Sequence, residues 1–230
     1  MIKALIMMAD YGHDPTETAI PYASFRAAGF EVSFATESGV SPRCDARMLE
    51  GILAIGTSRS VKSKYASMAA SQEWKNALSW SANEFDLCAY NLVFFPGGQD
   101  QSIRQLLDSV SVHKLLQAYF PMTRKPSANV VGAICHGVKV LADTNNDSGH
   151  SILHGNVTAV LPSFFEQLAF QSLRPFVDGD YCKVYGAESE DLEHAVQKKL
   201  QHGTDLKTSW SLFPFVVEND DFNYISAEGV

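Results

Sequence analysis

Short hydrophobic runs alternate along the chain with longer stretches of mixed polarity. Four apolar runs, at residues 3–8, 31–35, 91–95 and 130–134, have the length of buried strands, and each ends in a turn or loop. The stretches between them carry apolar residues at helical spacing. Strands that alternate with helices pack as a parallel sheet with right-handed crossovers, so this pattern predicts an α/β fold.

Helical periodicity is clearest at residues 13–30, 103–120 and 188–202, and a short helix is expected at residues 164–170. In the first of these stretches, Gly29 is placed to end the helix. The residues expected to form the buried face of that helix are Ile20, Ala23, Ala27 and Ala28.

The segment at about residues 38–90 is long for one crossover between strands. Residues 62–82 predict one or two helices, and we expect part of the segment to form a flank or lid beside the functional site. Three aromatic residues in it would line a roomier pocket if the substrate were large, namely Tyr65, Trp74 and Trp80. Because no repeat, low-complexity tract or linker divides the chain, residues 1–230 are predicted to form a single domain. A short late strand is expected at residues 216–217.

Composition narrows the classes of partner. Hydrophobic residues make up 46% of the 230-residue chain and charged residues 19%, as in an ordinary soluble globular enzyme. The net charge of −8 disfavours nucleic acid or an anionic membrane as a partner. The sequence has no run of about 18 apolar residues that could span a bilayer. We therefore expect a small-molecule substrate.

The cysteine spacing argues against a structural metal. Cys44, Cys88, Cys135 and Cys182 form no CxxC pair, so no metal site is expected. A chain of this length does not need a disulfide scaffold, and reduced thiols in a cytosolic or nuclear compartment are expected.

The stretch NVVGAICHGVK, residues 129–139, combines the strongest signals. A buried strand passes through Cys135-His136-Gly137 into helical sequence, which is the geometry of a nucleophile elbow. At such a turn the helix dipole and the free N–H groups of the first turn favour a thiolate. The alternative is a buried structural cysteine, since free cysteine is among the most buried residue types.

Two other loops follow predicted strands at their carboxyl ends, where ligands bind in doubly wound sheets. The first brings Tyr11, His13 and then Glu17, whose carboxyl either caps a helix or acts as an acid/base facing the thiol. The second brings Gly97 and Gly98. These glycines either form a tight turn or help to build an oxyanion hole.

The N–H groups of Gly98 and His136 are the candidate oxyanion donors. The His136 side chain could also act as the base beside Cys135, but an imidazole in that role needs an acidic group to orient it. Glu166, which opens the helix expected at residues 164–170, is the best candidate for that acid. Its alternative is a solvated acid at a helix start.

Together, AICHG after an apolar strand, PGG after the preceding strand and an early helical glutamate resemble the ThiJ/PfpI family, also called the DJ-one superfamily. The resemblance covers essentially the whole chain, including LVFFPGG and DFNYISA, and is nearest to the chaperone–glyoxalase III branch. One departure is Val138, where many members have proline. Relatives also continue past the equivalent of Val230 through a basic and aromatic stretch, so this end is expected to be truncated or altered.

The resemblance implies a flavodoxin-like doubly wound α/β sandwich, a class I glutamine amidotransferase-like domain with a mainly parallel sheet, and a homodimer. It makes Cys135 the nucleophile and Glu17 the acid that hydrogen-bonds it. It also implies that His136 and Glu166 complete a triad. The residues it places around an oxyanion are Gly97, Gly98 and His136.

The activity that the resemblance favours is glyoxalase III-type conversion of a 2-oxoaldehyde such as methylglyoxal to a hydroxy acid, with no cofactor. Hydration of an isocyanide, or another C–N hydrolase or lyase reaction of a biosynthetic pathway, would use the same groups. A holding chaperone or a redox sensor is the alternative from another class, because a reactive cysteine meets the requirements of a sensor as well.

Overall fold

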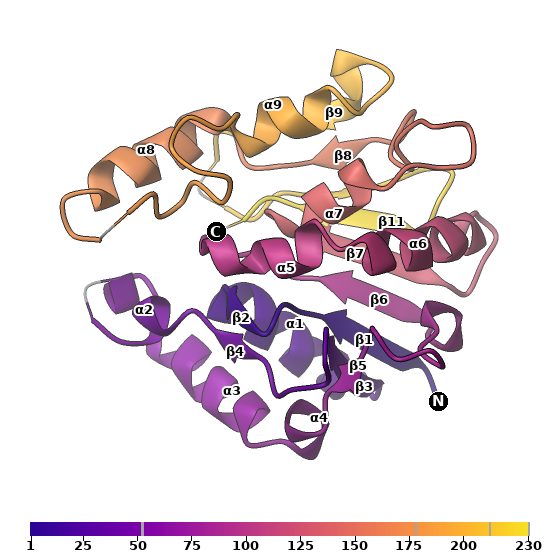
Figure 1. Cartoon of the computed structure of the whole chain (residues 1–230), viewed down its shortest axis with the longest axis horizontal. Helices are drawn as coiled ribbons and strands as arrows, with labels where there is room; N and C mark the ends of the chain where they lie inside the picture. Colours follow the sequence, from indigo (N-terminus) through magenta and orange to yellow (C-terminus); the bar gives the residue numbers. More distant parts are fainter. Residues whose placement is uncertain (52, 178, 212, 230) are drawn as a thin grey trace.

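The computed structural model describes residues 1–51, 53–177, 179–211 and 213–229, and its centre is a seven-stranded sheet with the strand order β10-β11-β7-β6-β1-β3-β5 (Figure 1). All neighbouring strands pair in parallel except β10 and β11. The strands are β1 (Lys3–Met7), β3 (Glu31–Thr36), β5 (Leu78–Ser79), β6 (Leu92–Phe95), β7 (Val130–Ile134), β10 (Val216–Glu218) and β11 (Tyr224–Ala227). Two small parallel pairs lie outside this sheet, β2 (Tyr11–His13) with β4 (Arg43–Cys44), and β8 (Thr158–Ala159) with β9 (Leu206–Lys207).

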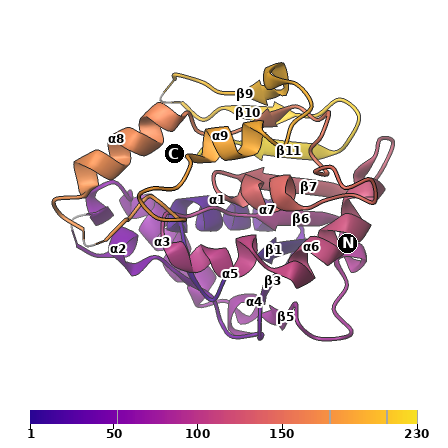
Figure 2. The same cartoon turned by 45° about the horizontal axis from the view of Figure 1, so that its top comes forward.

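Helices cover both faces of this sheet. They are α1 (Pro15–Ala27), α2 (Ala46–Leu49), α3 (Arg59–Ala69), α4 (Gln72–Lys75), α5 (Arg104–Leu107), α6 (Val110–Tyr119), α7 (Gly137–Asp143), α8 (Ser163–Leu173) and α9 (Leu192–Gln197). Short 3₁₀ turns are found at Leu53–Ile55, Leu87–Ala89, Gln101–Ile103, Phe120–Thr123 and Gly203–Asp205. Figure 2 shows α8 and α9 lying together above the sheet, beside the last residues of the chain.

Strand β1 shows how the core is divided. Leu5 and Met7 pack with side chains of α5, α6 and α7, whereas Ala4 and Ile6 pack with side chains of α1, α3 and α4. Successive residues of a strand point to opposite faces of a sheet. A strand that is buried on both faces therefore appears in the sequence as a continuous apolar run.

The four apolar runs of the sequence form β1, β3, β6 and β7, so the predicted parallel α/β fold is confirmed. The helix expected at residues 103–120 is divided into α5 and α6, because Ser109 caps α6 by accepting a hydrogen bond from the Val112 N–H at 3.4 Å. The expected helix at residues 188–202 shortens to α9, and β11 was not predicted.

Helix α1 lies where it was predicted, but the expected buried face is wrong. Ile20 is 36% exposed, and Ala27 and Ala28 are also exposed. The buried side carries Ala19 and Tyr22 instead, together with polar residues of the first turns. Polar groups face inward here because the helix begins at the carboxyl edge of the sheet, so a hydrophobic pattern alone misplaces its face.

The segment at residues 38–90 does not line a pocket with its aromatic residues. Trp74 and Trp80 are buried in the core, and the Trp74 ring packs edge-on against Phe34 at 4.9 Å and against Tyr65 at 5.9 Å. The expectation of an aromatic pocket wall from this segment is therefore wrong. Part of the segment does flank the site, because β4 pairs with β2 in the loop that precedes α1.

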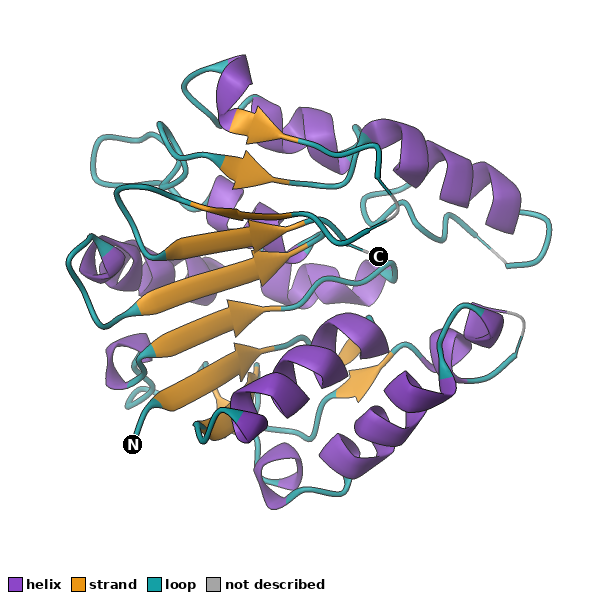
Figure 3. Cartoon of the chain, turned by 180° about the vertical axis from the view of Figure 1, so that it is seen from behind, coloured by secondary structure: helices purple, strands orange, loops and turns teal. Residues whose placement is uncertain are grey.

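The parallel strands give the sheet one carboxyl edge. Figure 3 shows the arrowheads of the central strands pointing to the same side, where the C-terminal end lies. Within the part of the chain that the structure describes, no helix is long and apolar enough to cross a membrane.

Candidate active site

Cys135 forms a sharp turn between β7 and α7 at this edge. Its backbone has φ 53°, in the left-handed region that non-glycine residues rarely adopt. The Cys135 N–H donates to the Ala227 carbonyl of β11 at 3.0 Å, and the Val138 N–H donates to the Cys135 carbonyl at 3.1 Å. Both backbone groups are thus fixed by neighbouring elements, which hold the strained turn in place.

Glu17 reaches the same place from α1. Asp14 caps that helix by accepting the Thr16 and Glu17 N–H groups, so the Glu17 carboxyl is free to point away from its own helix. Its Oε2 accepts the Gly97 N–H at 2.9 Å, and its Oε1 and Cys135 Sγ both lie against Gly229, so the carboxyl faces the thiol. The alternative that Glu17 merely caps its own helix is therefore not what the structure shows.

Burial sets the proton affinities of this pair. Burial and then the nearby Asp14 carboxyl raise the pKa of Glu17 well above its usual value, while the Gly97 N–H partly opposes the shift. Burial and the Glu17 carboxylate raise the pKa of the Cys135 thiol, and the His136 N–H lowers it. Two groups this close cannot both carry negative charge cheaply, so the titrations of Glu17 and Cys135 are linked.

His136 follows the thiol and is also buried. Its Nδ1 lies 3.5 Å from Cys135 Sγ. Burial lowers the pKa of the His136 imidazole to about 4, and the charges of Lys139 and Lys183 add to this effect. The ring is therefore neutral at physiological pH and can accept a proton.

Gly97 lies against all three catalytic candidates. A Cβ added there would lie 2.7 Å from Glu17 Oε2, 2.8 Å from Cys135 Cβ and 2.8 Å from the His136 nitrogen. Gly98 packs instead against the first loop, where a Cβ would lie 2.5 Å from the Gly12 carbonyl oxygen. The two glycines are thus needed for close approach, each to a different part of the site.

His13 holds two of the three loops together. Its Nε2 accepts the Ala9 N–H at 2.7 Å, so the ring proton is on Nδ1, which donates to the Gly97 carbonyl at 2.9 Å. Burial lowers the pKa of His13 to about 4, and the neutral ring keeps both bonds. His13 is a positioning residue for the glycine turn.

Gly229 covers the thiol. A Cβ added to Gly229 would lie 2.8 Å from Cys135 Sγ and 2.7 Å from Glu17 Oε1. The preceding residue, Glu228, is tied down on both sides, because its N–H donates to the Phe215 carbonyl and its carboxylate accepts the Ser209 N–H. With this cover Cys135 is only 1% exposed.

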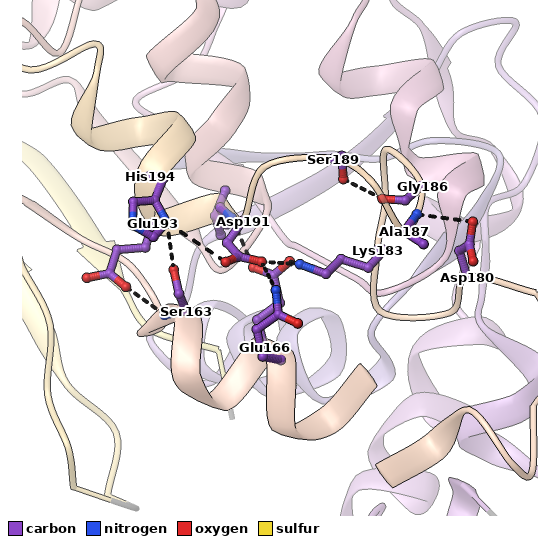
Figure 4. Close-up of polar contacts among 12 residues, drawn as sticks. Ser163, Glu166, Asp180, Lys183, Gly186, Ala187, Ser189, Asp191, Glu193 and His194 are labelled. Carbon is purple, nitrogen blue, oxygen red and sulfur yellow. Dashed lines mark hydrogen bonds and ion pairs between the residues drawn. The ribbon is translucent and has the colours of Figure 1, made fainter. Parts of the chain in front are cut away.

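Glu166 is buried on α8, but its carboxylate binds elsewhere (Figure 4). Oε1 accepts from Lys183 Nζ at 3.1 Å, and Oε2 accepts the Leu192 N–H at the start of α9 at 2.9 Å. Lys183 also pairs with Asp191. Among the described residues no hydrogen bond joins Glu166 to His136, so the expected His136–Glu166 pair is replaced by a clamp between α8 and α9.

No metal site accompanies these groups in the described part of the chain, where no three His, Cys, Asp or Glu side chains come together as ligands. All four cysteines are free thiols. What the arrangement offers is a thiol, a carboxyl with a raised pKa and a neutral imidazole, which are the components of nucleophilic and acid–base catalysis.

Comparison with known sequences decides the family. A family model described as ThiJ/PfpI family-like matches residues 8–202. The chain belongs to this family. An uncharacterized protein of Schizosaccharomyces pombe is 32% identical over 132 residues, which cover 56% of this chain and 49% of that protein. A second uncharacterized protein of the same yeast is 22% identical over 152 residues, 59% of this chain and 49% of its own length. This chain therefore spans about half the length of the curated relatives it matches.

Solved structures of the ThiJ/PfpI and DJ-one type share the fold. The 24 KDa Rapid Encystment Protein of Francisella tularensis superposes with a TM-score of 0.68 at 16% identity, covering 100% of this chain and 92% of that one. Glyoxalase III of Candida albicans superposes with a TM-score of 0.61 at 16% identity, covering 99% and 91%. At these identities the likeness establishes the flavodoxin-like architecture.

Sequence reasoning missed Lys183 and Gly229. Lys183 lies in an irregular segment. Its buried amino group pairs with the carboxylates of Glu166 and Asp191, which lie elsewhere in the sequence but beside it in space. Gly229 reaches the thiol only because β11 pairs with β7, and that strand was not predicted. A correct assignment of β11 would have brought residues 228–229 to the site.

Proposed function

We propose that Cys135 is the nucleophile of a cofactor-independent enzyme that converts a 2-oxoaldehyde to a 2-hydroxy acid. The observation that carries the proposal is the left-handed backbone of Cys135 beside the buried Glu17 carboxyl. Such a conformation costs on the order of 1–3 kcal/mol and persists where a fixed geometry is needed. The family membership supports a reaction of this kind, since one protein of the same fold is a glyoxalase III.

The reactive form has its proton on Glu17 and a thiolate at Cys135. Because burial and Asp14 raise the pKa of Glu17, its neutral form is favoured. A neutral carboxyl no longer repels the thiolate and instead donates to it, and the His136 N–H stabilises the same negative charge. This proton transfer converts a buried thiol into a nucleophile without exposing it to water.

The thiolate adds to the aldehyde carbon, and the aldehyde oxygen takes the Glu17 proton to give a hemithioacetal. As charge develops on that oxygen, the N–H groups of His136 and Gly98 are the proposed donors. The Gly97 N–H has a different task, since it holds the Glu17 carboxylate at 2.9 Å.

The neutral His136 ring then removes the hydrogen on the former aldehyde carbon and returns a proton to the neighbouring carbon. In the same step the Glu17 carboxylate, which gave up its proton in the addition, takes the hemithioacetal hydroxyl proton and delivers it to the ketone oxygen. The product is a thioester of the 2-hydroxy acid on Cys135. Water hydrolyses this thioester, releases the acid and restores the proton shared by Cys135 and Glu17. The sequence adds one water and is redox-neutral overall, so it needs no external oxidant or reductant.

Turnover of methylglyoxal tests the proposal, with lactate measured directly. Wild type and Cys88→Ala, a substitution at a thiol that lies outside the site, are expected to form lactate, and Cys135→Ala is expected to form none. Lactate formation in Cys135→Ala at more than about a tenth of the wild-type rate would contradict a nucleophilic role. Formamide from cyclohexyl isocyanide, with no lactate from methylglyoxal, would assign the site to isocyanide hydration instead.

A further inference from the structure

A cavity of about 260 Å³ lies beside the covered thiol. Gly229 forms part of its wall and also lies against Cys135 Sγ, so the cavity begins where the cover of the thiol ends. Leu161, Phe165 and Ala169 supply an apolar part of the wall, the last two from α8. An apolar chamber is thus continuous with the residue that covers the nucleophile.

One polar group in the cavity wall lacks a partner. Gln99, the residue after the glycine turn, has a buried Oε1 with no hydrogen-bond partner among the described residues. A buried acceptor left unpaired costs roughly 1–3 kcal/mol. Because the oxygen itself is fully covered, it offers the cavity no open acceptor, and the apolar side chains of the wall carry the assignment.

We infer that this cavity binds the apolar substituent of the substrate, and that the substrate class is a 2-oxoaldehyde carrying an aryl or branched alkyl group. The inference rests on the proposed function, because it assigns the remaining part of the same substrate. The carbonyl carbon has to approach Sγ to about 3–3.5 Å, at the position that Gly229 covers. The group attached to that carbon then extends into the adjacent cavity.

The size of the cavity fits an aromatic ring. An apolar cavity of about 150 Å³ in another protein holds benzene, and this one measures about 260 Å³. A methyl substituent would leave most of the space unfilled.

Filling the cavity tests this assignment. Ala169→Phe places a ring in the space, and the smaller Ala169→Leu fills it in part if the larger side chain prevents folding. Leu168→Phe is the matched control, because Leu168 is 51% exposed on the same helix and does not line the cavity. The kcat/KM values for phenylglyoxal and methylglyoxal are measured for wild type and each variant, with mandelate and lactate as products.

Wild type is expected to prefer phenylglyoxal by about tenfold or more. Ala169→Phe is expected to remove that preference with less than about a threefold change for methylglyoxal. Ala169→Leu should have a smaller effect in the same direction, and Leu168→Phe should have none. Equal losses for both substrates in the Ala169 variants, or no preference in wild type, would overturn the cavity assignment.

A second readout separates this inference from the proposed function. Alkylation of Cys135 by iodoacetamide and by its N-benzyl derivative, followed at the Cys135 peptide by mass spectrometry, requires no turnover. The cavity predicts that the benzyl reagent is favoured in wild type and disfavoured in Ala169→Phe. If neither aldehyde is converted but this ratio shifts as predicted, the glyoxalase activity fails and the cavity stands. An unchanged ratio rejects the cavity.

Discussion

Gly229 lies directly against the Cys135 thiol, so close that any side chain there would overlap it. A Cβ at Gly229 would lie 2.8 Å from Sγ and 2.9 Å from Cys135 Cβ. Cys135 belongs to the turn after β7, whereas Gly229 follows β11, the strand that pairs with β7. The pairing of these two strands thus determines how the Cys135 thiol is covered, and under the proposed function a substrate has to displace the segment at residues 228–229 to reach it.

Gly229→Ala is predicted to uncover the thiol. The elbow and α1 are fixed by the sheet, so the added methyl group has to move the segment at residues 228–229. The rate of Cys135 alkylation by iodoacetamide is expected to rise at least about threefold, because the open state becomes more populated. Gly203→Ala is the control, since a Cβ there meets nothing closer than 3.5 Å. Equal rates in both variants would show that Gly229 does not restrict access.

Glu17→Gln is predicted to remove turnover while keeping the fold. The amide can still accept the Gly97 N–H, but it has no proton to exchange with Cys135. Loss of the acid/base should lower kcat/KM for the preferred aldehyde by about 10²–10⁴-fold. Glu31→Gln, at an exposed position on β3, should leave the rate unchanged. A loss of less than about tenfold in Glu17→Gln would exclude the proton transfer proposed for this carboxyl.

The same substitution is predicted to stabilise the protein at high pH. Since the folded-state pKa of Glu17 is raised, the folded protein holds a proton that the unfolded chain releases above about 4.5, so ionisation favours unfolding as the pH rises. Glu17→Gln removes this penalty. Urea unfolding should therefore give the variant a larger free energy of unfolding than wild type at pH 8, with a smaller difference at pH 4. A difference independent of pH would contradict the raised pKa.

His13→Leu is predicted to destabilise the protein in a pH-dependent way. It leaves the Ala9 N–H without its acceptor and removes one donor from the Gly97 carbonyl, which keeps the Asp14 N–H, at a cost of about 2 kcal/mol near pH 7.5. In wild type the pKa of His13 is lowered to about 4, so the unfolded chain binds a proton between pH 6.5 and 4 that the folded protein does not bind. Wild type therefore loses the stability that depends on His13 as the pH falls through this window. The difference in the free energy of unfolding between wild type and the variant should be smaller at pH 5 than at pH 7.5. His150→Leu, at an exposed histidine, should show no such narrowing.

Lys183→Met is predicted to be among the most destabilising single substitutions. It leaves the Glu166 carboxylate buried without its cation, which costs about 3–5 kcal/mol. Adding Glu166→Gln to this variant should recover part of the loss, because the amide keeps the contact with the Leu192 N–H. The single variant Glu166→Gln should retain aldehyde turnover within about threefold, whereas a catalytic acid would cost about 10²–10⁴-fold. A loss of that size would restore Glu166 to a triad with His136.

Much of this architecture could be predicted from local sequence. The strands that are buried on both faces read as apolar runs, and the strained turn at Cys135 followed from one such run passing directly into a helix. The meeting of Glu17, Gly97 and Cys135 at one edge followed from the parallel arrangement of the strands.

Other features depend on contacts that local sequence does not encode. A glutamate near the start of a helix gives the same sequence pattern whether it is exposed to solvent or buried in an ion pair. For Glu166, only the position of Lys183 in the folded chain distinguishes the two cases. Strand β11 is short and partly polar, and its buried Ser226 accepts the Ala159 N–H at 2.8 Å through the hydroxyl oxygen. The face of α1 was misjudged because its inward side carries the polar groups that the site requires.

The most direct test of the account is acid quenching during turnover, with the Cys135 peptide analysed by mass spectrometry. While aldehyde remains, a nucleophilic Cys135 should carry the added mass of one substrate molecule, as the thioester of the hydroxy acid. When the aldehyde has been consumed, Cys135 should return to the free thiol. Covalent catalysis at this residue would be contradicted if hydroxy acid forms steadily while Cys135 stays unmodified at every time point, and if Cys135→Ala forms hydroxy acid at the same rate as wild type.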